Sequence, residues 1–470
     1  MEWPKQQFNL SSWRCHPGIT NTPPSPARRS IPTSPRNGRS SLTAAPRLAS
    51  DRVWCPQSPP HPGRNQTRPP LTADHSRYHD RMKLKQQPED FRVEELTAAT
   101  GGDSGEFAFY RLDKTGWTTP DALAAVRRRW QIDFQRLSYG GLKDRHAVTS
   151  QYLTIWRGPK RNLTHERVTL THLGQRNQPY ASHEITANRF TLTLRSMSDI
   201  AVSVAATALA EVERCGLPNY FDDQRFGSVE DSTAFIAKEM VRGQFEEALK
   251  LALMAPYEFD RREAKREKAT LKLHWGDWPT LKAKLPRGHA RSLVDYLVSH
   301  PTDFKGAVAR LRPELQGLYL SAYQSYLWNR MLAAWLTRTL GAENLASVEL
   351  KLGKVPVPIR LPDEKRAEWD SLTLPLPSSR VKLALDDALT PIIEEALKAE
   401  GLTLADVRIR GMEKPFFSKG DRPGCVRLAN LSHDHEPDDV NPGTRKLILK
   451  FDLPRGSYAT MLVKRVTAIV

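Results

Sequence analysis

Regular spacing of hydrophobic positions begins near Lys83 and continues almost to the end of the chain. Alternation with a period of two, as at 190–194, is typical of a strand that has one buried face. The same pattern predicts strands near 91–96, 107–112, 135–139, 148–156, 189–195 and 446–451.

Hydrophobic positions spaced three and four residues apart predict helices in the segments between and after these strands. Thr119 and Pro120 are suited to the N-cap and the first position of one helix. Ser198 or Asp199 is suited to begin a second, which would end before Gly216. Further helices are predicted at 246–253, 290–299, 319–340, 391–400 and 458–466.

Residues 1–81 show no such periodicity, and they hold 14 of the chain's 35 prolines. A segment of this kind cannot bury enough apolar surface to offset the entropy lost on ordering, so we predict that it is disordered. Three origins fit it: an over-extended start upstream of Met82, an organellar transit peptide, or an RNA-binding tail.

The charge balance indicates a polyanionic partner. The chain carries 70 Lys and Arg against 53 Asp and Glu, which is a formal net charge of +17. Residues 1–81 contribute +8 (12 against 4), and the remaining residues contribute +9 (58 against 49). An excess of this size is typical of proteins that bind nucleic acid.

Neither a metal nor a membrane is indicated. The cysteines lie far apart and form no C-x-x-C pair, so we expect no zinc site and a reducing compartment. The His-Asp-His-Glu run at 433–436 lies in what reads as an acidic loop without strand or helix spacing, and we do not expect it to bind a metal. No run of about 18 apolar residues occurs. The chain reads as a soluble intracellular protein.

The most distinctive segment contains a glycine-permitted turn, Gly140-Gly141, followed by Lys143, Asp144 and Arg145. Two flanking cations favour the ionised form of an aspartate and lower its pKa. A carboxylate at such a loop–strand junction can act as a nucleophile at neutral pH. Spacing alone also allows a structural role, in which Asp144 caps a turn or pairs with a neighbouring cation.

This segment, 138–151, resembles the G-x-K-D-x-x-A-x-T-x-Q signature of the TruD family of tRNA pseudouridine synthases. Four further segments are similar to the family's other motifs and follow in the family's order. They are 84–91, where a lysine precedes a phenylalanine by six residues, 217–227 with N-Y-F-x-x-Q-R-F-G, 320–329 with S-A-x-x-S-x-L-x-N, and 451–460 with F-x-L-P-x-G-S-Y-A-T.

The resemblance implies an α+β fold. It consists of a pseudouridine synthase catalytic domain with a mostly antiparallel sheet, and an inserted α/β domain specific to the TruD family. We expect the catalytic domain to combine 82–235 with 426–470 and the inserted domain to comprise 236–425. Residues 1–81 would precede both.

The resemblance also implies roles for two charged residues. Asp144 occupies the position of the family's catalytic aspartate, and Lys85 occupies that of the cation facing it. A buried Lys–Asp pair would keep the acid ionised and oriented. Taken without the resemblance, Lys85 reads as a solvated strand lysine.

Phe91, Phe221 and Tyr458 lie at motif positions that the family places around the target base. A flipped uridine needs an aromatic or apolar face in place of the stack it has left. Asn219 can offer a donor and an acceptor to the uracil edge, or hold the aspartate loop. The ordinary alternatives are core packing for the aromatic residues and a turn for Asn219. Supporting roles are expected for Gln151, Gln224 and Arg225.

The implied reaction converts uridine to pseudouridine in tRNA, commonly at uridine-13, without a cofactor or a metal; relatives accept other structured RNAs. We expect a cytoplasmic enzyme with no membrane attachment and no obligate protein partner. Two other classes stay open. One is a non-catalytic RNA-binding protein or tRNA chaperone on the same scaffold, which would not need Asp144. The other is a hydrolase that pairs Asp144 with Asp222 or Asp223, about 5–10 Å away.

Overall fold

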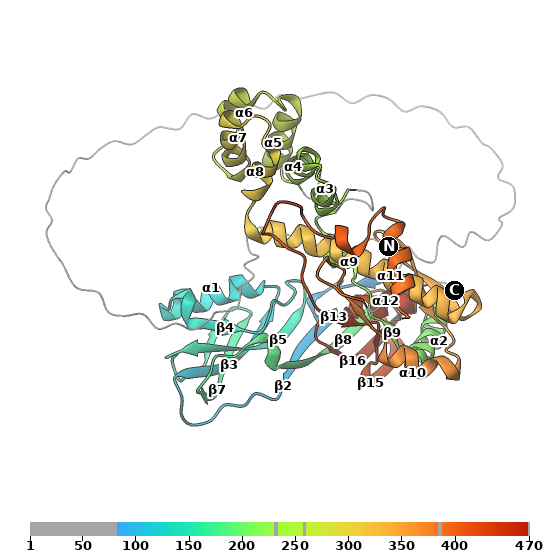
Figure 1. Ribbon diagram of the computed structural model, residues 1–470. Helices are drawn as coiled ribbons and strands as arrows, with labels where there is room; N and C mark the ends of the chain where they lie inside the picture. Colours follow the sequence, from blue (N-terminus) through green and yellow to red (C-terminus); the bar gives the residue numbers. More distant parts are fainter. Residues whose placement is uncertain (1–81, 230–233, 257–259, 384–387, 469–470) are drawn as a thin grey trace, which may run out of the picture. The chain divides into compact units, whose positions relative to one another are not determined.

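The computed structural model describes residues 82–229, 234–256, 260–383 and 388–468; residues 1–81, which we predicted to be disordered, lie outside these ranges. A ten-stranded sheet has the strand order β15-β16-β8-β2-β5-β3-β7-β6, with β1 paired to β8 and β4 paired to β5 (Figure 1). Within it β2 and β5 run parallel and the other neighbours run antiparallel. The mostly antiparallel sheet agrees with the prediction.

The strands of this sheet come from two separated parts of the chain. The first part contributes β1 (Lys83–Leu84), β2 (Phe91–Thr97), β3 (Phe107–Thr115), β4 (Leu137–Tyr139), β5 (Val148–Trp156), β6 (Leu163–His165), β7 (Val168–Arg176) and β8 (Ile185–Met197). The second part contributes β15 (Ala429–Pro437) and β16 (Arg445–Pro454). Because β16 pairs with β8, the C-terminal segment is built into the same sheet.

Helices cover the sheet through two hydrophobic cores. In the first, α1 (Thr119–Trp130) contributes Leu123 to a core that also contains Leu153 of β5. In the second, α2 (Asp199–Cys215) and α12 (Ala459–Thr467) contact each other, and α2 also contacts β16. Of the two caps predicted for α2, Ser198 is confirmed, since its hydroxyl accepts the N–H of the third helical residue, and Asp199 is the first residue of the helix.

The region between α2 and β15 is mostly helical. Its helices are α3 (Ile236–Arg242), α4 (Phe245–Met254), α5 (Arg262–Leu273), α6 (Trp278–Lys284), α7 (His289–Ser299), α8 (Phe304–Ala309), α9 (Pro313–Leu340), α10 (Asp363–Ser371) and α11 (Thr390–Lys398). Its short strand pairs are β10 (Leu345–Leu350) with β11 (Gly353–Pro358), β12 (Thr373–Pro375) with β13 (Asp421–Pro423), and β9 (Leu217–Pro218) with β14 (Cys425–Val426). None of the described helices is long and apolar enough to cross a membrane.

Two local predictions were wrong. Thr118, not Thr119, caps α1, and its hydroxyl accepts the Asp121 N–H at 3.1 Å. The run at 433–436 is not a loop, because it lies within β15 and pairs with β16. Both errors have a local cause. Adjacent threonines are equally good caps, and an exposed edge strand has no buried face to produce alternation.

Candidate active site

The loop that joins β4 to β5 carries Asp144 and is held by two buried side chains. The hydroxyl of Thr119 accepts the Lys143 N–H at 3.0 Å and donates to Gln151 Oε1 at 2.8 Å. Gln151 Nε2 donates in turn to the Gly141 carbonyl at 3.1 Å. Thr119 is available for this contact because the neighbouring threonine caps α1.

The Asp144 carboxylate forms an ion pair with Lys85, and the two side chains are only 16% and 5% exposed. Asp144 Oδ1 also accepts the backbone N–H of His146 at 3.0 Å. Burial by itself would raise the pKa of Asp144, but Lys85 and His146 outweigh it and hold that pKa below its ordinary value. The carboxylate is therefore ionised at neutral pH.

Lys143, the sequence neighbour of Asp144, pairs with a different acid. Its ammonium lies 3.1 Å from Glu95 Oε2 and also donates to Asn188 Oδ1. Glu95 is fully buried in β2 and accepts the Tyr180 hydroxyl at 2.9 Å. Lys143 thus anchors the loop to β2 and β8, and the cation that faces Asp144 comes from a distant segment.

Lys85 sits in an unusual backbone conformation, with φ at 60° in the left-handed region. Such a conformation costs a non-glycine residue about 1–3 kcal/mol, and it persists where the surroundings enforce it. The Lys85 ammonium lies 3.9 Å from the centroid of the Phe91 ring. Two of the residues predicted from the motifs, Phe91 and Asp144, therefore contact the third, Lys85.

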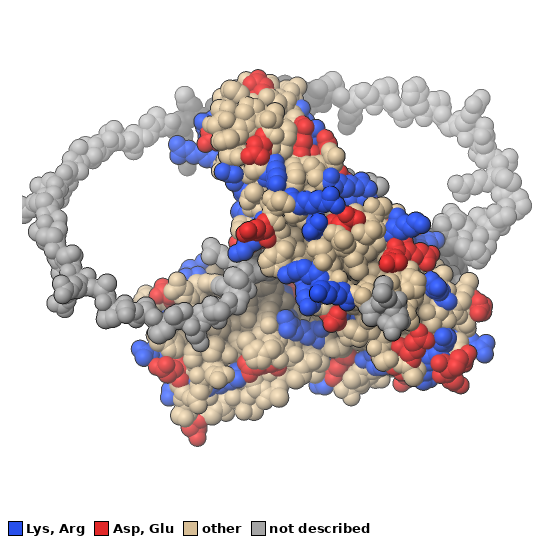
Figure 2. All heavy atoms as spheres, in the orientation of Figure 1, with Lys and Arg blue, Asp and Glu red and all other residues tan. Residues whose placement is uncertain are grey.

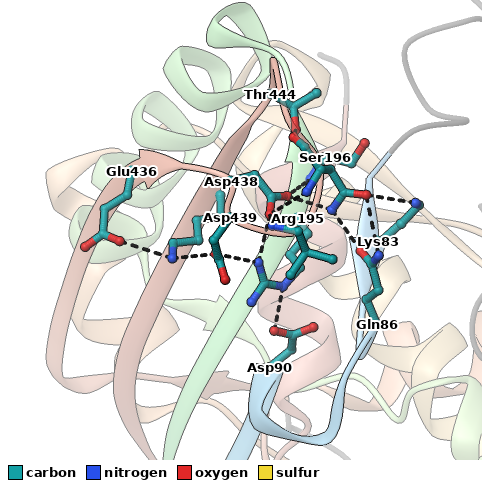
Figure 3. Close-up of polar contacts among 12 residues, drawn as sticks. Lys83, Gln86, Asp90, Arg195, Ser196, Glu436, Asp438, Asp439 and Thr444 are labelled. Carbon is teal, nitrogen blue, oxygen red and sulfur yellow. Dashed lines mark hydrogen bonds and ion pairs between the residues drawn. The ribbon is translucent and has the colours of Figure 1, made fainter.

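A buried arginine on β8 holds the segment that precedes β2 (Figure 3). Arg195 Nε donates to Asp90 at 2.7 Å, and its Nη1 donates to Asp438 at 2.8 Å. Asp438 also accepts Asn441 Nδ2 at 2.8 Å, and Asn441 Oδ1 accepts the ammonium of Lys83 at 3.0 Å. These contacts fasten the segment 83–90, which contains Lys85, to β8 and to the connection between β15 and β16.

The other predicted residues surround Phe221. Its ring meets Trp328 and Tyr458 edge-on, at 5.5 and 6.3 Å between centroids. Two guanidinium groups, of Arg422 at 4.1 Å and Arg225 at 5.5 Å, lie over the same ring. Burial raises the pKa of the Tyr458 phenol, so the hydroxyl is protonated at neutral pH. In the described part of the chain, neither arginine forms an ion pair with a carboxylate.

Arg422 is a site residue that sequence reasoning missed. Its Nη2 donates to Asn219 Oδ1 at 2.7 Å, and Asn219 Nδ2 donates to the Pro423 carbonyl at 3.0 Å. Arg422 also donates to the carbonyls of Asn219 and Gly456. Burial lowers the pKa of Arg422 to about 10, which still leaves it charged at neutral pH. No motif covers Arg422, and only the pairing of β14 with β9 brings its segment to Asn219.

The six predicted residues thus form two groups, one around Asp144 and one around Phe221. A row of aromatic rings begins at Phe91 of the first group and crosses β2, β8 and β16. Phe91 meets Phe190 at 6.2 Å, and Phe190 stacks on Phe451 at 5.5 Å. β16 then leads into the turn before α12, which carries the tyrosine of the second group.

Asp222 and Asp223, the acids that the hydrolase hypothesis needs, are engaged elsewhere. Both form ion pairs with Lys464 of α12, at 2.9 and 2.5 Å. Thr460 donates to Asp222, and the Lys351 N–H donates to Asp223 at 2.8 Å. These carboxylates fasten α12, so the geometry offers the hydrolase hypothesis no support.

A mostly antiparallel sheet with an ionised aspartate in the loop before β5 fits the pseudouridine synthase class of isomerases. The family model of tRNA pseudouridine synthase D (TruD) matches residues 78–352 and 356–466. The chain therefore belongs to the TruD family of tRNA pseudouridine synthases, and it is an RNA-modifying isomerase.

Individual relatives are similar over nearly their full lengths. The chain is 30% identical over 399 residues to the probable tRNA pseudouridine synthase D 1 of Methanococcus maripaludis, covering 83% of this chain and 100% of the relative. It is 28% identical over 398 residues to the tRNA pseudouridine synthase D of Aquifex aeolicus, covering 82% and 97%. The crystal structure of TruD from Methanosarcina mazei matches with a TM-score of 0.65 and 25% identity, covering 82% and 93%.

Proposed function

We propose that this enzyme isomerises uridine-13 of tRNA and that Asp144 is its nucleophile. The observation that carries the proposal is the buried ion pair of Asp144 with Lys85, two residues that the motifs single out independently. Burying two charges costs free energy that their attraction only partly returns. A module that only binds RNA has no need of this carboxylate, whereas a nucleophile must be both ionised and fixed.

In the proposed reaction Asp144 acts at the ribose of the target uridine, by attack on C1′ or by removal of a neighbouring proton. Either route requires the ionised carboxylate that Lys85 maintains. The glycosidic bond breaks, the uracil turns, and its C5 bonds to C1′. C5 then loses its proton and N1 gains one, so the product is an isomer of the substrate.

The aromatic residues would hold the flipped base. Phe221, Tyr458 and Phe91 offer the apolar faces that an unstacked uracil needs. Asn219 would contact the uracil edge, because its carboxamide has a hydrogen and a lone pair beyond those used by Arg422 and the Pro423 carbonyl.

The proposed tRNA contact draws on the charge of the surface. On the face shown in Figure 2, Lys and Arg side chains gather over α9 and beside β13, where tRNA phosphates would bind.

We also propose the domain division 82–235 with 426–470 and an insertion at 236–425. It is supported by the sheet, whose strands come only from the two outer parts.

The test uses the full chain and tRNA transcripts that carry tritium at uridine C5. Wild type is expected to release tritium, and Asp144→Asn, which keeps the shape but not the charge, is expected to release none while still binding tRNA. A transcript with cytidine at position 13 should release none above background. Binding without release by wild type would favour the RNA-binding hypothesis, and release by Asp144→Asn would exclude Asp144 as the nucleophile.

A further inference from the structure

Lys114, on β3, is a lysine with only 1% of its surface exposed, and it is among the largest fully buried side chains of the described chain. Lysine is almost never buried to this extent unless an acid pairs with it. In the ranges that the structure describes, no carboxylate lies within ion-pair distance of its ammonium. Packing alone does not account for such a group, because an apolar residue would fill the space without the cost of burying a charge.

Main-chain carbonyls take the place of an acid. Lys114 Nζ donates to the carbonyls of Trp117 at 2.7 Å, Asp144 at 2.8 Å and Lys143 at 3.4 Å. An ammonium has three hydrogens, so its donor capacity is used in full. Two of the three acceptors belong to consecutive residues of the loop that presents the Asp144 carboxylate. The third belongs to the turn that leads into α1, from which Thr119 holds the same loop.

We propose that Lys114 is a positioning residue for the isomerisation, acting through the backbone of Lys143 and Asp144. Its ammonium fixes two successive peptide carbonyls, and this fixes the direction in which the Asp144 side chain leaves the loop toward Lys85. The inference rests on the proposed function, since it assumes that Asp144 reacts. It adds a residue that never touches the substrate.

The charge of Lys114 is necessary for this role. Burial lowers the pKa of Lys114 to about 8; among the charged groups that face it, Asp144 opposes this shift and Lys143 adds to it. Above that pH a neutral amine has two hydrogens and a lone pair, so one of the three carbonyls would face a lone pair instead of a donor. The loop then loses part of its support, and the reaction rate should fall.

The free energy of unfolding should respond to rising pH in the opposite direction from the reaction rate. The pKa of an unfolded lysine is about 10.4, so between about pH 8 and pH 10 the unfolded chain holds more protons at this site than the folded one. The contribution of Lys114 to the free energy of unfolding therefore rises with pH across this window. If Lys114 had only a structural role, activity would follow the free energy of unfolding and would not fall across this pH window. If Lys114 positions the loop, activity falls across the window although stability is maintained.

The experiment measures single-turnover tritium release by the full chain from about pH 6.5 to 9.5. Wild type should lose rate with a midpoint near the Lys114 pKa of about 8, at unchanged tRNA affinity. In Lys114→Arg this decline should be absent, because a guanidinium stays charged throughout. Lys114→Met should be about 10²-fold slower at pH 7. Lys268→Met is the control for removing a lysine ammonium away from the site: Lys268 donates to the Ala255 carbonyl and also pairs with Asp260, and the variant should keep the wild-type rate and profile.

A flat wild-type profile between about pH 7 and 9 would overturn the inference even if both Lys114 variants failed to fold. So would an unchanged decline in Lys114→Arg, or a folded Lys114→Met with the wild-type rate. These results differ from a failure of the proposed function, in which wild type itself would release no tritium from any tRNA.

Discussion

The Lys85 ammonium pairs with the Asp144 carboxylate and lies 3.9 Å from the centroid of the Phe91 ring. Strand direction explains why these residues meet. β2 and β5 are adjacent and parallel, so both strands begin at the same edge of the sheet. The segment before β2, with Lys85, and the loop before β5, with Asp144, are therefore brought together.

Lys85→Met should slow the reaction most at low pH. Lys85 holds the pKa of Asp144 below its ordinary value, so its removal raises that pKa and moves the acid limb of the rate profile to higher pH. The ratio of the variant's single-turnover rate to that of wild type should be lower at pH 5 than at pH 8. Lys83→Met, at an exposed position two residues before Lys85, should keep the wild-type profile. A ratio independent of pH would show that Lys85 does not control the ionisation of Asp144.

Two adjacent threonines should separate stability from catalysis. Thr118→Val removes the cap of α1 and should lower the free energy of unfolding by about 0.5–2 kcal/mol without changing the single-turnover rate. Thr119→Val leaves the Lys143 N–H and Gln151 Oε1 without a partner, at a cost of about 1–3 kcal/mol. It should also slow the reaction by about 10-fold or more, because the aspartate loop shifts. Both variants are first shown to be folded by urea unfolding. Equal single-turnover rates in the two folded variants would contradict the assignment of Thr119, and not Thr118, to the aspartate loop.

Arg195 should be among the most important residues for stability. Arg195→Met leaves the buried carboxylates of Asp90 and Asp438 without their cation, and we expect a loss of about 3–5 kcal/mol in urea unfolding. Arg445→Met provides the comparison, because its ion pair with Asp199 is exposed and should contribute only about 0–1 kcal/mol. Similar losses in the two variants would mean that the buried network is not a principal support of the fold.

The ring of Tyr458, not its hydroxyl, should matter for the base pocket. The ring contacts Phe221, and among the described residues its hydroxyl forms no hydrogen bond. Tyr458→Phe should therefore keep the rate within about 3-fold, whereas Tyr458→Ala should lower it by about 10-fold or more. Single-turnover rates at saturating enzyme separate this effect from tRNA binding. A large loss in Tyr458→Phe would instead assign the hydroxyl a direct part in the reaction.

Most elements were predictable because their signals are local. The alternation at 190–194 and the capping serine at 198 fall within β8 and directly before α2, where the structure has them. The sequence was not decisive where two neighbouring residues suit the same role or where a strand lacks a buried face. Thr118 and Thr119 are both capping residues, and the polar edge strand β15 has no periodicity that marks it as a strand.

By itself the sequence determined the fold class, the family resemblance and the six residues on which the proposed site depends, since motifs of fixed spacing carry that information. Without the family resemblance it could not determine which cation faces Asp144, because Lys143 and Arg145 are closer along the chain than Lys85. Nor could it reveal Arg422 and Lys114, whose partners lie far away in sequence. Strand order, the parallel pairing of β2 with β5 and the pairing of β9 with β14 decided those contacts, because they arise only when separate segments share one sheet or one core.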